Sequence, residues 1–256
     1  MPGRSARLRW LLGMGRPERQ MVQSLLDPDE RENLATHWKL WARPEQLAPA
    51  GEWRTWLICA GRGFGKTRTG AEWVRYVARH NPAARIALVG ASLPEVRSVM
   101  VEGESGLLNC HPVRHRPQFE PSLRRITFAN GAQATLFSAG EPDSLRGAQH
   151  SHAWCDEIAK WDNSSDRAIH AWDNLMMGLR LGQRPRALAT TTPRAVPLMQ
   201  KLLARDGEDR TRVTRGTTFD NADHLPAQFI ADMQRDYGDT ALGRQELRGE
   251  LLRDVE

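Results

Sequence analysis

The stretch CAGRGFGKT at residues 59–67 comes directly after the apolar run Trp56-Leu57-Ile58. This order predicts a buried strand, a glycine-rich loop and then a helix, which is the setting in which such a loop binds nucleotide phosphates. Backbone N–H groups can surround a triphosphate only where no Cβ blocks their approach, and glycine meets that need. The helix would present its positive N-terminal end to the phosphates. We therefore expect a P-loop.

Individual residues of this loop have expected roles. Lys66 would reach the β- and γ-phosphates, and the Thr67 hydroxyl would bind Mg²⁺. The first glycine of the usual pattern falls on Ala60 and an extra glycine follows at Gly61, so we interpret the stretch as a variant P-loop. The alternative, a glycine-rich turn that binds nothing, leaves the adjacent Lys-Thr unexplained. The residues expected to bind ATP here are Gly61, Gly63, Phe64, Gly65, Lys66 and Thr67.

A short apolar strand at residues 153–155 ends in two acids, Asp156 and Glu157. Downstream of a P-loop, Asp156 would hold Mg²⁺, and Glu157 would orient and deprotonate the attacking water. The second carboxylate indicates a hydrolase, because simple phosphotransfer needs only the aspartate. Two surface acids at a strand end are the alternative.

Two arginines and a threonine run complete the candidate site. Arg62 stands where most P-loops have a neutral residue, and it could act on the γ-phosphate as an arginine finger in cis; a salt bridge with a nearby acid is the alternative. Arg146, beside Gly147, could project from a loop towards a neighbouring subunit. Thr190, Thr191 and Thr192 end a strand where nucleotide motors carry a γ-phosphate sensor, although strand-to-turn chemistry also explains them.

Composition narrows the class of protein. The chain has 256 residues, of which 26% are charged and 40% hydrophobic, as in soluble globular proteins. A net charge of +5 indicates an acidic partner, with nucleic acid the first candidate. Three cysteines without disulfide spacing favour a reducing cytoplasm. No apolar run approaches the ~20 residues that a membrane helix needs, so we expect no membrane association.

Strands that alternate with helical patterns predict an α/β fold, with a mainly parallel central sheet flanked by helices and nucleotide at the carboxyl ends of the strands. Asn130-Gly131 between alternating segments predicts one antiparallel hairpin. We expect a loosely ordered basic arm at 1–26, an ATPase core at 27–220 and a helical C-terminal segment at 221–256. Helices are expected near 27–41, 66–80, 93–108, 166–181, 226–237 and 239–251, with one more after Pro193.

Together these motifs resemble the ATPase domain of the large terminase subunit, the DNA-packaging motor of tailed phages and phage-like gene transfer agents. The resemblance runs from about Asp27 to the end and is closest to the gene-transfer-agent branch. It rests on the order and spacing of ARPEQ at 42–46, the P-loop with GAEW at 70–73, LRG at 145–147, WCDE at 154–157, TTTPR at 190–194 and GRQEL at 243–247.

The resemblance implies a RecA-like P-loop NTPase of the ASCE class, whose Mg²⁺-dependent ATP hydrolysis drives double-stranded DNA into a capsid. It adds Gln46 as the adenine contact, makes Arg146 an arginine acting in trans, and assigns Thr190 to Thr192 to coupling. It also implies a portal protein, a small terminase subunit and a homo-oligomeric ring of five, with a monomer in isolation and bacterial cytoplasm as the location.

In the family, an RNase H-like nuclease domain follows the segment resembling residues 243–256. No downstream carboxylate cluster for two-metal cleavage is present, so we expect a truncated or split protein and no DNA cutting by this chain. Two other functions stay open. A helicase-like ATPase would usually need a second RecA-like domain, and an ATP-gated assembly module would bind nucleotide without hydrolysing it.

Overall fold

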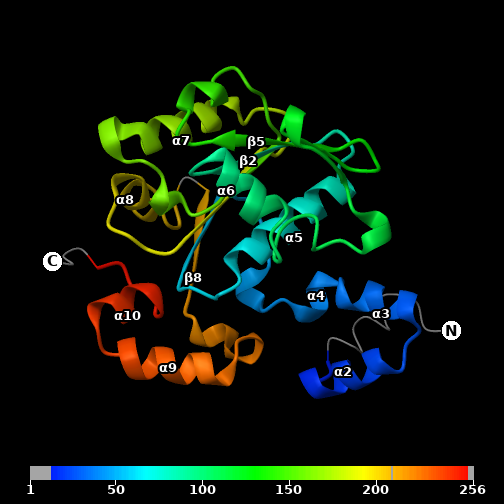
Figure 1. Cartoon of the computed structure of the whole chain (residues 1–256). Helices are drawn as coiled ribbons and strands as arrows, with labels where there is room; N and C mark the ends of the chain where they lie inside the picture. The colour runs from blue at the N-terminus through cyan, green and yellow to red at the C-terminus, as the bar shows by residue number, and fades with distance from the viewer. Residues whose placement is uncertain (1–12, 209, 253–256) are drawn as a thin grey trace.

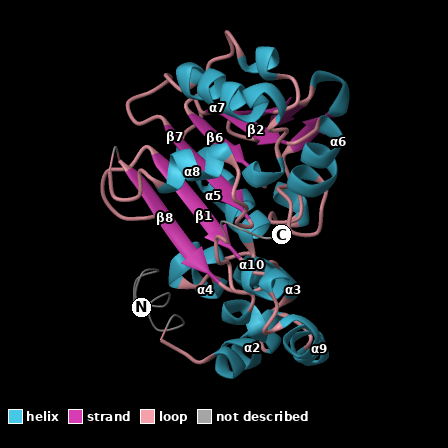
Figure 2. Ribbon diagram, turned by 90° about the vertical axis from the view of Figure 1, so that its left-hand side faces the viewer, coloured by secondary structure: helices cyan, strands magenta, loops and turns pink. Residues whose placement is uncertain are grey.

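A computed structural model describes residues 13–208 and 210–252, in which helices cover both faces of one eight-stranded sheet (Figures 1 and 2). The strand order is β3-β4-β5-β2-β6-β7-β1-β8. The predicted α/β fold with a mainly parallel sheet is confirmed. The strands are β1 Thr55–Ala60, β2 Arg85–Gly90, β3 Gln118–Glu120, β4 Arg125–Thr127, β5 Gln133–Ser138, β6 His152–Cys155, β7 Arg186–Thr191 and β8 Thr211–Gly216.

The helices fill the connections between strands. The longest, α5, begins after Gly65, which has a left-handed backbone, and its last turn carries Arg79 and His80, whose charge suits the negative end of a helix. The helices are α2 Arg16–Ser24, α3 Pro28–Ala35, α4 Trp38–Trp41, α5 Lys66–His80, α6 Leu93–Glu95, α7 Arg167–Gly178, α8 Pro197–Leu203, α9 Ala227–Tyr237 and α10 Ala241–Glu246. Short 3-10 turns include η1 Pro44–Gln46, η5 Pro142–Leu145, η6 Ile158–Lys160 and η8 Phe219–His224.

The order of the strands brings the P-loop and the acidic pair together. β7 lies between β1 and β6 and is parallel to both, with Ala189 in register with Leu57 on one side and Cys155 on the other. The carboxyl ends of these three strands therefore lie side by side. In Figure 2 the arrowheads of β1 and β8 point towards α4 and α10, so those helices border the same edge of the sheet.

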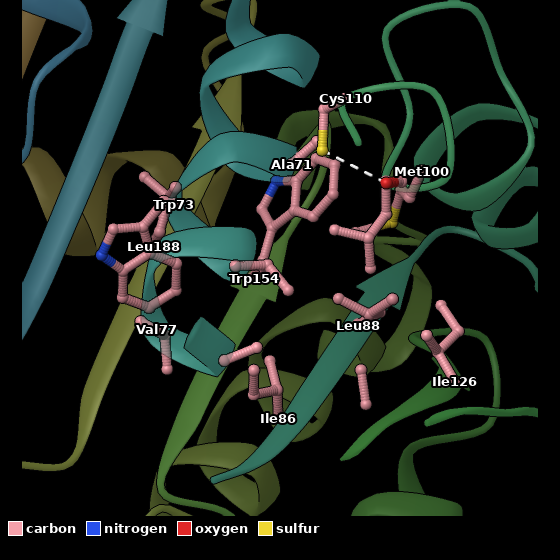
Figure 3. Close-up of a cluster of buried hydrophobic side chains, with 14 of the residues drawn as sticks. Ala71, Trp73, Val77, Ile86, Leu88, Met100, Cys110, Ile126, Trp154 and Leu188 are labelled. Carbon is pink, nitrogen blue, oxygen red and sulfur yellow. Dashed lines mark hydrogen bonds between the residues drawn. The ribbon is translucent and has the colours of Figure 1, made fainter. Parts of the chain in front are cut away.

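Packing fixes the P-loop helix against the sheet. Trp154 of β6 is completely buried, in a cluster that includes Ala71 and Leu188 (Figure 3). A Cβ placed on Gly70 would lie 2.0 Å from the Trp154 indole, so only glycine permits α5 to come this close. The helix that opens at the P-loop is thereby held directly over the strand that carries the acids.

The expected hairpin forms, because β4 pairs antiparallel with β5, and β5 joins the sheet through parallel pairing with β2. Two predicted helices are wrong in extent. The one expected over 93–108 is α6 followed by a π-helical turn, Val96–Val101, and it stops there. A Cβ on Gly103 would lie 2.7 Å from the Val99 carbonyl oxygen, so the glycine folds back on the preceding turn. The helix expected over 27–41 is interrupted between α3 and α4.

The two ends of the chain were expected to be an arm and a helical linker. Residues 1–12 of the arm lie outside the described residues, and Arg16–Ser24 form α2. The C-terminal part is helical, as α9 and α10, and it contacts the P-loop. Within residues 13–208 and 210–252, no helix combines the length and apolar character that crossing a membrane requires.

Candidate active site

The P-loop turns from the end of β1 over the N-terminus of α5. Gly63 and Gly65 have φ values of 71° and 93°, a left-handed conformation that favours glycine. Gly61 meets a different need, since a Cβ there would lie 2.4 Å from the Leu247 carbonyl oxygen. Ala60 takes the place of the usual first glycine because it is still the last buried residue of β1. The variant sequence thus has a structural reason.

Lys66 is buried at the base of the loop. Its Nζ donates to the carbonyls of residues 60 and 61 (2.9 and 3.0 Å) and to Thr192 Oγ1 (3.0 Å). The same atom lies 3.6 Å from Glu157 Oε1. Burial lowers the pKa of Lys66, while the negative charge of the neighbouring acids acts in the opposite direction. The ammonium is therefore centred between the P-loop and the acidic pair, as the sequence predicts.

Asp156 lies behind the cleft surface and is buried. Burial raises its pKa to about 6, against the hydrogen bond from Thr190, whose Oγ1 donates to Asp156 Oδ1 over 2.6 Å. The indole of Trp161 donates to the backbone carbonyl of Asp156 (3.1 Å). Together with Thr67, which lines the cleft, this carboxylate supplies oxygens of the kind that Mg²⁺ prefers.

Glu157 faces the cleft from an unusual backbone conformation. Its φ of 45° and ψ of 53° are left-handed, which costs a non-glycine residue about 1–2 kcal/mol. Its Oε2 accepts a hydrogen bond from the backbone N–H of Thr192 (3.1 Å). The carboxylate is thus held between Lys66 and the end of β7, where it could act on a water molecule.

The three predicted coupling residues each contact a different part of this site. Thr190 bonds Asp156, as described, and Thr191 Oγ1 accepts from the backbone N–H of Ala159, just beyond the acidic pair (3.2 Å). Thr192 contacts both Lys66 and Glu157. The end of β7 therefore links the P-loop to both acids.

Arg62 forms the salt bridge that the sequence left open as an alternative. Its Nε donates to Glu246 Oε2 on α10, with 63% of the Arg62 side chain exposed against 11% for Glu246. The hydrogen bond from Glu246 raises the pKa of Arg62. Burial acts to raise the pKa of Glu246, but hydrogen bonds from Arg62 and Gln245 lower it on balance. Action of Arg62 on a γ-phosphate stays a prediction.

Gln46 lies beside the P-loop in η1 and is buried. Its Oε1 accepts from the backbone N–H of Arg43 (3.2 Å), and its Nε2 is 3.5 Å from the Gly65 carbonyl oxygen. Its contact with adenine stays a prediction. Trp38 and Arg68, to which the sequence assigned no role, line the same cleft, with the Arg68 guanidinium 5.9 Å from the Trp38 ring centre.

Arg146 does not join the site of its own chain. It follows η5, is exposed, and is absent from the described residues that line the cleft. That cleft has a volume of about 1090 Å³. Its wall includes Gln46, Arg62, Gly63, Gly65, Lys66, Thr67, Arg68, Glu157, Lys160, Thr192, Arg194, Asn221, His224, Leu225 and Glu246. Sequence analysis gave no role to the last five, because no local motif marks them.

Residues 57–255 match the family model described as "Terminase large subunit, T4likevirus-type, N-terminal". The chain belongs to this family. The match confirms the resemblance that the motifs indicated. A search of the curated proteins finds no match.

Solved structures of large terminases share the fold. The Thermus phage P74-26 large terminase ATPase domain aligns with a TM-score of 0.62 and 16% identity, over 89% of this chain and 100% of that one. The large terminase of a thermophilic bacteriophage, in complex with ADP, aligns with 0.64 and 16%, over 86% and 52%. The HK97 bacteriophage large terminase aligns with 0.59 and 15%, over 88% and 50%. This terminase chain therefore spans about half the length of the last two.

Proposed function

We propose that this large terminase domain is a Mg²⁺-dependent ATPase whose hydrolysis drives double-stranded DNA into a capsid. The observation that carries the proposal is the convergence of Lys66, Glu157 and Thr192 on one cleft beside the P-loop. The ADP and ATP-γ-S complexes of the large terminase from the thermophilic bacteriophage support nucleotide binding at this end of the sheet.

Each group has a role in the proposed hydrolysis. Lys66 places its charge on the β- and γ-phosphates, which draw it from its present bonds to the loop carbonyls. Glu157, freed from Lys66, orients a water molecule and accepts its proton. Thr67 and Asp156 would hold Mg²⁺, which neutralises phosphate charge when bound. The threonines of β7 transmit the change because they contact both acids.

The proposed motor works as an assembly. A match to the bacteriophage Phi-29 genome packaging motor assembly, with a TM-score of 0.54, supports this context. In our proposal five copies form a ring in the bacterial cytoplasm, on a portal protein and with a small terminase subunit selecting the DNA. Arg146, exposed and away from its own cleft, would complete a neighbour's site in trans, so a monomer would hydrolyse ATP slowly.

The test is steady-state ATP hydrolysis against protein concentration, comparing wild type with Glu157→Gln and Lys66→Ala. A general base contributes about 10²–10⁴-fold, so Glu157→Gln should abolish turnover. Turnover per chain should rise with concentration as neighbours supply Arg146. Activity that survives Glu157→Gln would contradict its assignment as the base. ATP binding without hydrolysis at any concentration would instead favour an assembly module.

A further inference from the structure

Three successive carbonyl groups of the P-loop accept hydrogen bonds from side chains outside the loop. Thr218 Oγ1 donates to the carbonyl of residue 62 over 2.6 Å, and Asn221 Nδ2 donates to that of residue 63 over 2.6 Å. Arg43 Nη2 donates to the carbonyl of residue 64 over 2.5 Å. We call Arg43, Thr218 and Asn221 the carbonyl clamp.

The members of the clamp come from opposite ends of the core and hold one another. Arg43 precedes η1 and Asn221 lies in η8, yet Arg43 Nη1 donates to Asn221 Oδ1 over 2.5 Å. The Arg43 guanidinium also lies 4.7 Å from the ring centre of Phe64, a residue of the loop itself. Each bond of the clamp therefore depends on its neighbour, and the loop is held along three consecutive peptides.

Peptide geometry gives the clamp a consequence for ligand binding. In a planar trans peptide the N–H points away from the C=O of the same unit. Fixing the carbonyls of residues 62–64 against the clamp therefore directs the N–H groups of residues 63–65 to the opposite side. Backbone N–H groups of such a loop are what bind phosphate oxygens, and prior orientation removes an entropic cost of binding.

We infer that the carbonyl clamp sets the P-loop for the polyphosphate part of its ligand, and that phosphate binding and the docking of residues 217–224 favour each other. The inference rests on the proposed function, since it concerns the same nucleotide site. Arg43, Thr218 and Asn221 act as positioning residues, because they reach the phosphates only through the loop backbone. Coupling of this kind is reciprocal: whatever the clamp adds to phosphate affinity, phosphate must add to clamp stability.

The C-terminal segment stays attached to the loop without these side chains. Backbone bonds run from the Arg62 N–H to the Glu246 carbonyl (2.7 Å) and from the Thr218 N–H to the Leu247 carbonyl (2.7 Å). Single side-chain variants of the clamp should therefore fold. Thr217 supplies a matched control, because its Oγ1 accepts from the Asp220 N–H within the same turn (3.2 Å) rather than donating to the loop.

The experiment measures binding of tripolyphosphate and of ATP by calorimetry, with Mg²⁺ present, for wild type, Asn221→Ala, Thr218→Val, Thr218→Ser and Thr217→Ala. Losing one clamp bond should weaken both ligands by the same factor, about tenfold. Thr218→Ser, which keeps the hydroxyl, and the Thr217→Ala control should bind as wild type does. In hydrogen exchange, tripolyphosphate should protect residues 217–225 in wild type and not in Asn221→Ala.

The outcomes separate the clamp from the proposed ATPase. Wild-type affinity for tripolyphosphate in Asn221→Ala and Thr218→Val would overturn the clamp, as would protection of residues 217–225 that is equal in wild type and Asn221→Ala. A wild-type protein that binds no polyphosphate would also overturn it, because there would be no phosphate site to set. A protein that binds ATP with the expected variant pattern but never hydrolyses it would leave the clamp standing and refute only the proposed function.

Discussion

Replacing Asp156 by asparagine should stabilise the ligand-free protein while removing its activity. Burial raises the Asp156 pKa from an ordinary 3.8 to about 6, and each pKa unit corresponds to about 1.4 kcal/mol, so the ionised carboxylate costs the fold about 3 kcal/mol. Asparagine still offers an oxygen to the Thr190 hydroxyl, but without a negative charge that bond weakens by about 1 kcal/mol. The expected net gain is about 2 kcal/mol, or roughly 4–8 °C in Tm.

The sign of the pH dependence identifies the cause. Because the folded pKa lies above the unfolded one, the folded state binds the proton more tightly, and wild-type stability falls as pH rises from 3.8 towards 6. The advantage of Asp156→Asn should therefore be smaller near about pH 5 than near about pH 7.5.

The assay is urea unfolding at both pH values without Mg²⁺, with the exposed Asp162→Asn as control. The control should bring no gain, because hydrogen bonds to Ser164 lower the Asp162 pKa. An Asp156→Asn protein less stable than wild type near neutral pH, or a gain that does not change with pH, would refute the reasoning.

Three further predictions concern packing and the arginines. Gly70→Ala should destabilise the fold by about 1–3 kcal/mol or more in denaturant titration, because its Cβ would overlap the Trp154 ring; an unchanged midpoint would show that α5 can shift. Glu246→Gln should change Tm little, since its partner Arg62 is mostly exposed, whereas Arg62→Ala should slow ATP turnover by about 10³-fold if the arginine acts on the γ-phosphate; equal turnover in both variants would exclude that role. Mixing Arg146→Ala with Lys66→Ala should restore part of the ATPase activity that each lacks alone, because a ring can then contain a P-loop lysine and a neighbour's arginine at one site; no recovery on mixing would indicate that Arg146 acts within its own chain.

The sequence by itself determined the parts of the site whose signals are local. The loop glycines before Lys66 and Thr67 identify the P-loop, since phosphate binding needs backbone that only glycine provides there. Two acids after a short apolar run identify the end of β6. Asn130-Gly131 identifies the hairpin, because the turn chemistry lies within two residues. The family followed from the order of these motifs, and residues 57–255 match its model.

Only the tertiary structure decided which distant residues meet at those motifs. Placing β7 between β1 and β6 brings Thr192 to Lys66 and Glu157, and a strand order cannot be deduced from local periodicity. The partner of Arg62 on α10 and the clamp on the loop carbonyls come from residues more than 150 positions away in the chain. Such contacts depend on where the sheet returns the C-terminal segment, a property of the whole topology that no short stretch of sequence encodes.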